Sequence, residues 1–134
     1  MSLKILHTSD IHLGMKFAGY PEVQADLCHA RFDCLENMVR IANEKECNLF
    51  VISGDIFDRV NIVKKDIIRA SNILKNFEGQ LVAVLPGNHD FISKGKIDLW
   101  SHFNENLGDN VLVLAERKIY PLDHYDLDVN LYAC

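Results

Sequence analysis

The sequence predicts an α/β fold in which helices cover a parallel β-sheet. Three short apolar runs alternate with two longer stretches whose apolar residues recur every three or four positions. The order strand, helix, strand, helix, strand is typical of parallel sheets, because parallel strands need a crossover connection that is usually a helix. The chain has 134 residues, of which 49% are hydrophobic, and this suits one domain with a buried core.

The first strand and the first helix are predicted at residues 3–7 and 23–46. Apolar side chains in the second range recur at alternating spacings of four and three, which makes one stripe along a helix: Cys28, Phe32, Leu35, Val39 and Ala42. The second strand is predicted at residues 48–52, where the apolar run NLFVI is bounded by the turn at Gly54.

A second helix is expected after Asn61, whose side chain is a suitable N-cap. One face of this helix carries a further apolar stripe, formed by Val63, Ile67, Ala70, Leu74 and Phe77. The helix should end near Gly79. The run QLVAVL then predicts a third strand at residues 80–85, stopped by Pro86 and Gly87.

The last third of the chain changes character. A short helix is predicted around residues 97–103. Three short strands are then predicted at residues 110–114, 118–122 and 127–133, at a spacing typical of hairpins.

Composition limits the classes of function. No apolar stretch is long enough to span a bilayer and no signal peptide is evident, so we expect a cytoplasmic protein without a membrane partner. The four cysteines form no CxxC pair, and Cys28 and Cys34 lie in a helical pattern, which predicts free buried thiols. The formal net charge is −5 with no obvious basic patch, which counts against DNA binding by these residues alone. Bound cations would offset the acidic residues locally.

A polar cluster follows each of the three predicted strands. The sequence reads TSDIHLG at residues 8–14, SGDIFDR at residues 53–59 and PGNHD at residues 86–90. In open parallel sheets, ligands bind at the carboxyl ends of the strands. We therefore expect the three clusters to meet at one edge of the sheet.

Four side chains of these clusters are suitable metal ligands: Asp10, His12, Asp55 and Asn88. Carboxylate, imidazole and amide oxygen ligands suit manganese, iron or zinc, with manganese our first choice. In an extended segment, residues two apart point the same way, so Asp10 and His12 can chelate one ion. Asp55 can bridge two ions about 3.5–4 Å apart, so two divalent metal ions are predicted.

Each motif alone has an ordinary explanation. A D-x-H tripeptide is usually part of an ordinary loop, and Gly-Asp is a common turn because both residues favour turns. Gly-Asn-His-Asp can be a turn closed by an Asx hydrogen bond. Three motifs in this order, each directly after a predicted strand, are not explained in this way and indicate a site.

The motif order D-x-H, GD-x-x-D and GNH-[DE] resembles that of the calcineurin-like metallophosphoesterase superfamily. Residues 10–12, 54–58 and 87–90 match it without a substitution. The resemblance implies a four-layer α/β/β/α sandwich, in which the predicted β-α-β-α-β unit forms the first sheet. By position, it also implies that Asp10 and His12 bind the first metal, that Asp55 bridges both metals and that Asn88 binds the second.

The resemblance also implies catalytic roles. His89 matches the family's catalytic histidine, which stabilises the developing charge on the scissile phosphate and protonates the leaving oxygen. Asp58 and Asp90 match residues that orient the ligands and this histidine.

The segment LHTSDIHLG resembles the SbcD-like DNA-repair exonucleases. Protein serine/threonine phosphatases carry GD-x-HG and GD-x-VDRG instead, whereas here Leu13 and Val60 stand where those motifs have glycine. The resemblance implies metal-dependent phosphodiester hydrolysis on DNA and an SbcC-like ATPase partner for the full-length protein. Three alternatives are a phosphatase or small-substrate phosphodiesterase, a metal-binding or dimerisation module without catalysis, and an α/β domain whose loop ends are merely polar.

The family's remaining histidine ligands have no counterpart after residue 90. His102 lies in the predicted short helix and His124 in a predicted hairpin loop, and we expect both to be packing or surface residues. We interpret residues 1–134 as a truncated amino-terminal portion of a nuclease domain. Catalysis by this portion should be absent or weak, and its uncovered apolar sheet face should cause self-association.

Overall fold

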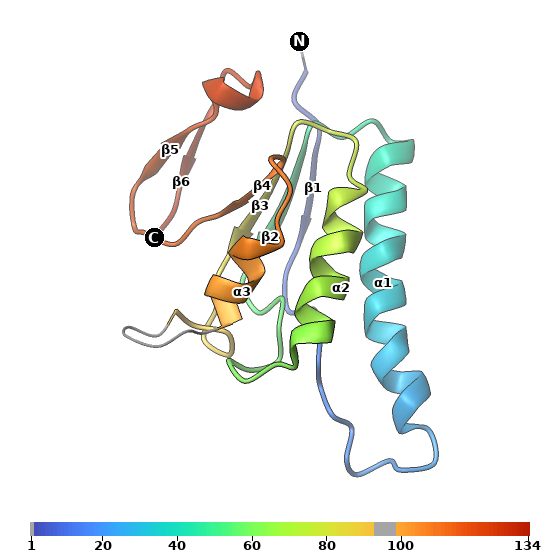
Figure 1. The fold of residues 1–134 in the computed structure, drawn as a ribbon. Coiled ribbons are helices and arrows are strands. Elements are labelled where there is room, and N and C mark those ends of the chain that lie inside the picture. Colours follow the sequence, from blue (N-terminus) through green and yellow to red (C-terminus); the bar gives the residue numbers. More distant parts are fainter. Residues whose placement is uncertain (1, 93–98) are drawn as a thin grey trace.

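The main sheet has four parallel strands. The computed structural model describes residues 2–92 and 99–134. The strands lie in the order in which the chain forms them: β1 (Ile5–Thr8), β2 (Leu49–Ser53), β3 (Leu81–Leu85) and β4 (Val111–Val113). All neighbouring pairs are parallel, so the carboxyl ends of the strands share one edge, the lower one in Figure 1.

Helices cover one face of the main sheet. They are α1 (Gln24–Glu44), α2 (Lys64–Lys75) and α3 (Leu99–Glu105). Successive side chains of a strand point to opposite faces. Phe50 and Ile52 of β2 accordingly pack with the helices, whereas Leu49 packs on the other face. Both faces of the central strands are therefore buried, as the apolar runs predicted.

A small antiparallel sheet covers the other face. It pairs β5 (Ile119–Pro121) with β6 (Asn130–Tyr132), and the 3-10 helix Asp123–Tyr125 lies between these strands. Its flanking side chains pack on β2 and β3 to form a second buried cluster, which includes Leu81, Ala83, Leu122, Leu127 and Ala133. Helices, main sheet and small sheet are three successive layers (Figure 1). The fourth expected layer is absent from the part of the chain that the structure describes.

The predicted β-α-β-α-β order is confirmed, with small shifts at the ends of elements. The strand predicted at residues 110–114 differs in its pairing. It forms β4, which is parallel to β3 rather than part of a hairpin, because α3 supplies another crossover between them. The helix predicted around residues 97–103 falls partly outside the described residues, and α3 is its described part.

Two local predictions were wrong. Asn61 does not cap α2, because the chain stays extended as far as Val63, and no side chain caps the helix. The thiol of Cys34 is exposed rather than buried, since Cys34 lies beside the buried stripe of α1 and not on it. Cys28 is partly buried, and the cysteines are free as predicted. None of the helices in the described residues is both long and apolar enough to cross a membrane.

Candidate metal centre

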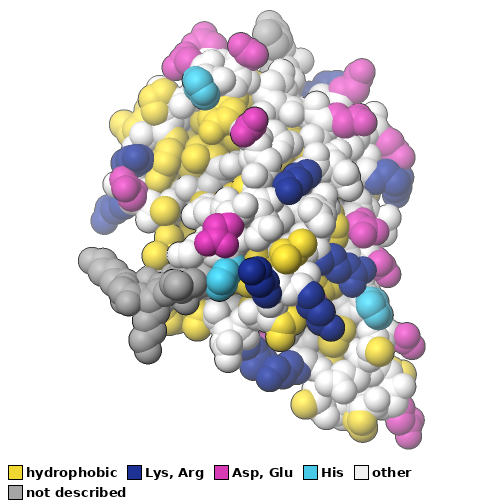
Figure 2. Space-filling model, in the orientation of Figure 1, with side chains coloured by type: hydrophobic (Ala, Val, Ile, Leu, Met, Phe, Trp, Pro, Cys, Tyr) yellow, Lys and Arg dark blue, Asp and Glu magenta, His cyan; other side chains and the backbone are white. Residues whose placement is uncertain are grey.

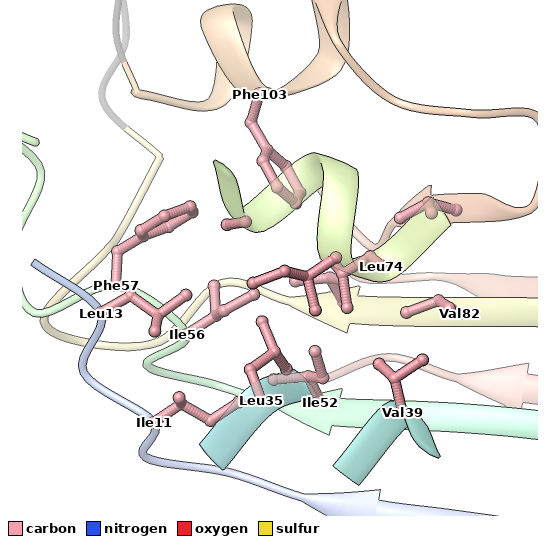
Figure 3. Close-up of a cluster of buried hydrophobic side chains, with 14 of the residues drawn as sticks. Ile11, Leu13, Leu35, Val39, Ile52, Ile56, Phe57, Leu74, Val82 and Phe103 are labelled. Carbon is pink, nitrogen blue, oxygen red and sulfur yellow. The ribbon is translucent and has the colours of Figure 1, made fainter. Parts of the chain in front are cut away.

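The loops after β1 and β2 are anchored by buried side chains between their polar ones. Ile11 and Leu13 of the first loop and Ile56 and Phe57 of the second are all at most 4% exposed. Figure 3 shows these four side chains pointing into the core beside Leu35 and Leu74. Burial of the apolar residues leaves the polar residues between them at the edge of the sheet.

Backbone hydrogen bonds join the two loops beyond the ends of their strands. The N–H of His12 donates to the carbonyl of Asp55 at 3.0 Å, and that of Leu13 to Ile56 at 2.8 Å. The N–H of Asp58 donates back to the carbonyl of Leu13 at 2.9 Å. These bonds fix the spacing between the D-x-H and GD-x-x-D motifs.

Three predicted ligands adopt the left-handed backbone region, in which residues other than glycine are uncommon. The φ angles are 56° at Asp10, 52° at His12 and 56° at Asp55. The segment from Asp10 to His12 is therefore not extended, and the predicted reason for their chelating one ion was wrong. Each such residue costs about 1–3 kcal/mol, and such strain clusters at functional sites.

Two glycines let the ends of β2 and β3 approach each other. Gly54 has φ +100°, and a Cβ atom on it would lie 3.5 Å from the Cα of Gly87. A Cβ atom on Gly87 would lie only 2.2 Å from Oδ1 of Asp55. The glycine of the GNH motif is therefore needed so that the turn can lie against the carboxylate of Asp55.

The structure brings most of the predicted site residues together. Ligand atoms of Asp10, His12 and Asp55 all lie within 4.8 Å of one another. Atoms of His12, Asp58 and His89 meet the same limit, so His12 is common to two candidate groups. The rings of His12 and His89 are 5.0 Å apart in an edge-to-face arrangement.

His12 has a nitrogen that fits a cation. Its Nδ1 atom is buried and has no hydrogen-bond partner, although Oδ1 of Asp58 lies 3.3 Å away. Its Nε2 atom lies 3.7 Å from Oδ1 of Asp10. Carboxylates converging on an imidazole with an unbonded nitrogen form a donor set that suits a divalent transition metal. The residues present therefore fit the predicted ions.

The third motif contacts the second through its backbone. The N–H of His89 donates to Oδ1 of Asp55 at 2.9 Å. The side chain of Asn88 is exposed and, among the described residues, has no hydrogen-bond partner. Asn88 thus lies in the turn that contacts Asp55, but its side chain is not joined to the other ligands.

Asp90 organises the loops. Its fully buried carboxylate accepts the N–H of Phe57 at 3.0 Å and the N–H of Gly87 at 2.6 Å. The indole N–H of Trp100 in α3 donates to its backbone carbonyl. Burial raises the pKa of Asp90, and the two backbone hydrogen bonds oppose the shift. These contacts are with the second and third loops rather than with the His89 ring.

Two polar neighbours of the site were not predicted. The hydroxyl of Ser9 donates to Asp10 at 2.7 Å, and this bond is the main reason why the pKa of Asp10 is lowered. The guanidinium of Arg59 lies 2.9 Å from Oδ2 of Asp58, whose other oxygen faces His12. Both residues adjoin a motif aspartate in sequence, which is the signal that could have found them.

The two later histidines lie elsewhere. His102 is partly buried in α3, where its Nδ1 atom lies 3.8 Å from Glu105. His124 is exposed between β5 and β6, with its ring 5.8 Å from that of Tyr125. Neither belongs to the candidate metal groups found among the described residues.

Comparison with known families agrees with this geometry. The calcineurin-like phosphoesterase family matches residues 3–130, which is nearly the whole chain. The chain belongs to this family. The three motifs at the edge of its sheet are therefore those of a calcineurin-like phosphoesterase, and the predicted superfamily resemblance is confirmed.

Curated relatives of this calcineurin-like phosphoesterase are DNA-repair proteins and a nuclease. DNA double-strand break repair protein Mre11 from Saccharolobus solfataricus is 31% identical over 66% of the chain and 23% of that protein. Mre11 from Methanosarcina acetivorans is 26% identical over 90% of the chain and 20% of that protein. The SbcD component of the nuclease SbcCD from Bacillus subtilis is 28% identical over 66% of the chain and 22% of that protein. The predicted SbcD-like branch is thus supported, and the chain spans about a fifth of the length of these relatives.

Proposed function

We propose that this chain supplies metal ligands and a catalytic histidine for hydrolysis of phosphodiester bonds in DNA. The observation that carries the proposal is the convergence of Asp10, His12 and Asp55 within 4.8 Å at the carboxyl edge of a parallel sheet. The names of the relatives, a double-strand break repair protein and a nuclease, favour DNA as the substrate.

The proposed roles follow from position. Asp10 and His12 bind one ion, Asp55 bridges to a second, and Asn88 is a ligand of the second through its amide oxygen. Manganese is the proposed ion, with iron and zinc as alternatives, since carboxylate and imidazole together suit all three. Divalent ions held there supply Lewis acidity toward a phosphodiester and a nucleophile at neutral pH.

The remaining motif residues act on protons and on geometry. His89 lies beside His12, where its imidazole can stabilise charge on the phosphate and protonate the leaving oxygen. Asp58 orients His12, and Asp90 holds the second and third loops in register through backbone N–H groups. Both carboxylates thus fix the positions of the groups that would touch substrate.

Three further properties belong to the proposal. An ATPase partner is suggested by the name of the Bacillus subtilis relative, which is one component of a complex. Cytoplasmic placement agrees with four free cysteines. Self-association is motivated by exposed apolar side chains that include Ile5, Ile119 and Tyr132, which are 50%, 52% and 71% exposed. Sedimentation of the chain as a monomer at every concentration would contradict this last property.

Hydrolysis assays with two variants test the function. The chain is incubated with manganese and either an oligonucleotide or p-nitrophenyl phosphate, and metal binding is measured separately. We expect slow cleavage of the oligonucleotide, loss of both binding and cleavage in Asp55→Asn, and loss of cleavage alone in His89→Ala. Faster release of p-nitrophenol than of nucleotides would favour a phosphatase. Metal binding without hydrolysis of either substrate would favour a module without catalysis.

A further inference from the structure

A groove of about 450 Å³ lies between the amino-terminal parts of α1 and α2. The loop that follows the D-x-H motif closes one side, since Gly14 and Met15 line the groove. Gly14 is two residues from His12, so the groove begins next to the candidate metal centre. Its charged lining consists of three cations and one carboxylate: Lys16, Lys65, Arg69 and Asp66.

Basic side chains gather around this groove although the chain as a whole carries a net charge of −5. Figure 2 shows Lys and Arg side chains collected over the start of α2. Five cations lie in or next to the amino-terminal halves of the two helices: Lys16, Arg31, Lys64, Lys65 and Arg69. Within residues 2–92 and 99–134, none of the five has an acidic partner within 4.0 Å. Their charge is therefore available to a ligand.

Arg69 is held in place by α1. Its guanidinium carbon lies 4.3 Å from the ring centroid of Phe32, which is 3% exposed, so the guanidinium is stacked on a fixed surface. Its Nη1 atom also lies 3.1 Å from Nδ1 of His29, which leaves the remaining N–H donors of the fork for another partner. A stacked and oriented guanidinium loses little freedom when it binds a phosphate.

Both helices begin at the groove without a side-chain cap. Val23 and Val63 are the N-cap residues, and neither helix start is satisfied by a side-chain hydrogen bond. Unbonded N–H groups and the helix dipole give each start a partial positive charge that favours anions. This field adds to the side-chain cations rather than opposing them.

We propose that the groove binds the sugar–phosphate backbone of one nucleic-acid strand next to the metal centre. The inference deepens the proposed function and rests on it for the identity of the substrate. Lys16, Lys65 and Arg69 contact phosphate oxygens, and Arg69 does so as a bidentate donor. The contacts are with backbone phosphates, so they carry no sequence preference.

Binding of a short fluorescein-labelled oligothymidylate in EDTA tests the groove without metal. Fluorescence anisotropy is followed over a range of potassium chloride concentrations for the chain and for Lys65→Gln/Arg69→Gln. The double variant should bind about tenfold more weakly, and its salt slope should fall by about 1.4, because each phosphate contact on a single strand contributes about 0.7. Arg69→Lys keeps the charge but loses the fork, and its affinity should be intermediate.

The matched control is Lys45→Gln/Lys75→Gln, which removes two exposed charges at the opposite ends of the same helices. It should change affinity less than twofold, and equal losses in both double variants would overturn the proposal. If the groove variant unfolds, Lys16→Gln on the loop replaces it with the same expectation of weaker binding. Displacement of the DNA by polyglutamate as effective as by unlabelled oligothymidylate would instead assign the groove to an acidic protein. Because EDTA removes metal, failure here leaves the metal-binding test of Asp55→Asn unaffected.

Discussion

The carboxylate of Asp55 accepts the backbone N–H of His89 at 2.9 Å across a sequence separation of 34 residues. This bond ties the end of β2 to the turn after β3. Asp55 is 7% exposed, while its neighbours in the candidate group, Asp10 and His12, come from the loop after β1. One buried carboxylate thus joins all three motifs, and each part of this arrangement can be tested separately.

Replacing Gly87 with alanine should destabilise the chain and weaken metal binding. The new Cβ atom would lie 2.2 Å from Oδ1 of Asp55 and 2.6 Å from its backbone nitrogen. Relief of such overlap requires the turn to move, at a cost of about 1–3 kcal/mol. Urea unfolding measures the loss. Gly19→Ala is the control, since a Cβ atom there meets nothing within 4 Å, and a similar loss in both variants would contradict the account.

The strained backbone at Asp10 predicts a difference between two substitutions. In metal-free buffer, Asp10→Gly should be about 1 kcal/mol more stable than Asp10→Ala, because glycine adopts φ near 56° without steric cost. Both variants should lose metal affinity. At Lys16, where φ is not positive, the order should reverse, and alanine should be the more stable residue. Thermal unfolding that gave the same order at both positions would contradict the strain.

Arg59 should support metal binding through Asp58. Its guanidinium lies 2.9 Å from one oxygen of Asp58, whose other oxygen lies 3.3 Å from Nδ1 of His12. Arg59→Ala frees this carboxylate to move, and partners behind a ligand typically affect metal affinity about 10–100-fold. Calorimetric titration with manganese measures the change. Arg40→Ala removes the exposed pair with Glu44 and should leave metal affinity unchanged, so equal losses would refute the role.

The buried carboxylate of Asp90 predicts a pH dependence of stability. Its pKa is raised above the ordinary value of 3.8, mainly because burial disfavours the charged form. Between that value and the raised one, the folded chain holds a proton that the unfolded chain has lost. The free energy of unfolding contributed by Asp90 therefore falls as pH rises through this window, by at most about 1.4 kcal/mol per unit.

Comparison with Asp90→Asn isolates this contribution, because the other titrating groups are common to both chains. In metal-free buffer, the stability of the parent relative to the variant should decline as pH rises above 3.8. A difference that stays constant, or that grows with pH, would contradict a raised pKa.

The layout of the fold and the place of the site could be predicted because they depend on simple periodicities. Apolar stripes such as Phe32 to Ala42 fix a helix face, and parallel strands bring their carboxyl ends together wherever the loops begin. These two rules sufficed to bring Asp10, Asp55 and His89 to one edge of the sheet.

Details that depend on tertiary contacts could not be predicted. Asn61 has the chemistry of a cap, but the loop before α2 runs two residues further. The left-handed backbone at His12 reflects loop-to-loop hydrogen bonds that no local pattern encodes. The basic residues near the groove are scattered between Lys16 and Arg69 in sequence, so their gathering arises only when α1 packs on α2.

The central claim is that Asp55 joins ligands from separate strand ends into one metal site. Electron paramagnetic resonance of free manganese, titrated into the chain and into Asp55→Asn, tests it most directly. Asparagine keeps an oxygen for the N–H of His89, so the fold should survive and circular dichroism can verify this. The account predicts that the parent chain depletes the free manganese signal and that the variant binds at least about tenfold more weakly. No depletion by the parent, or equal depletion by both chains, would contradict it.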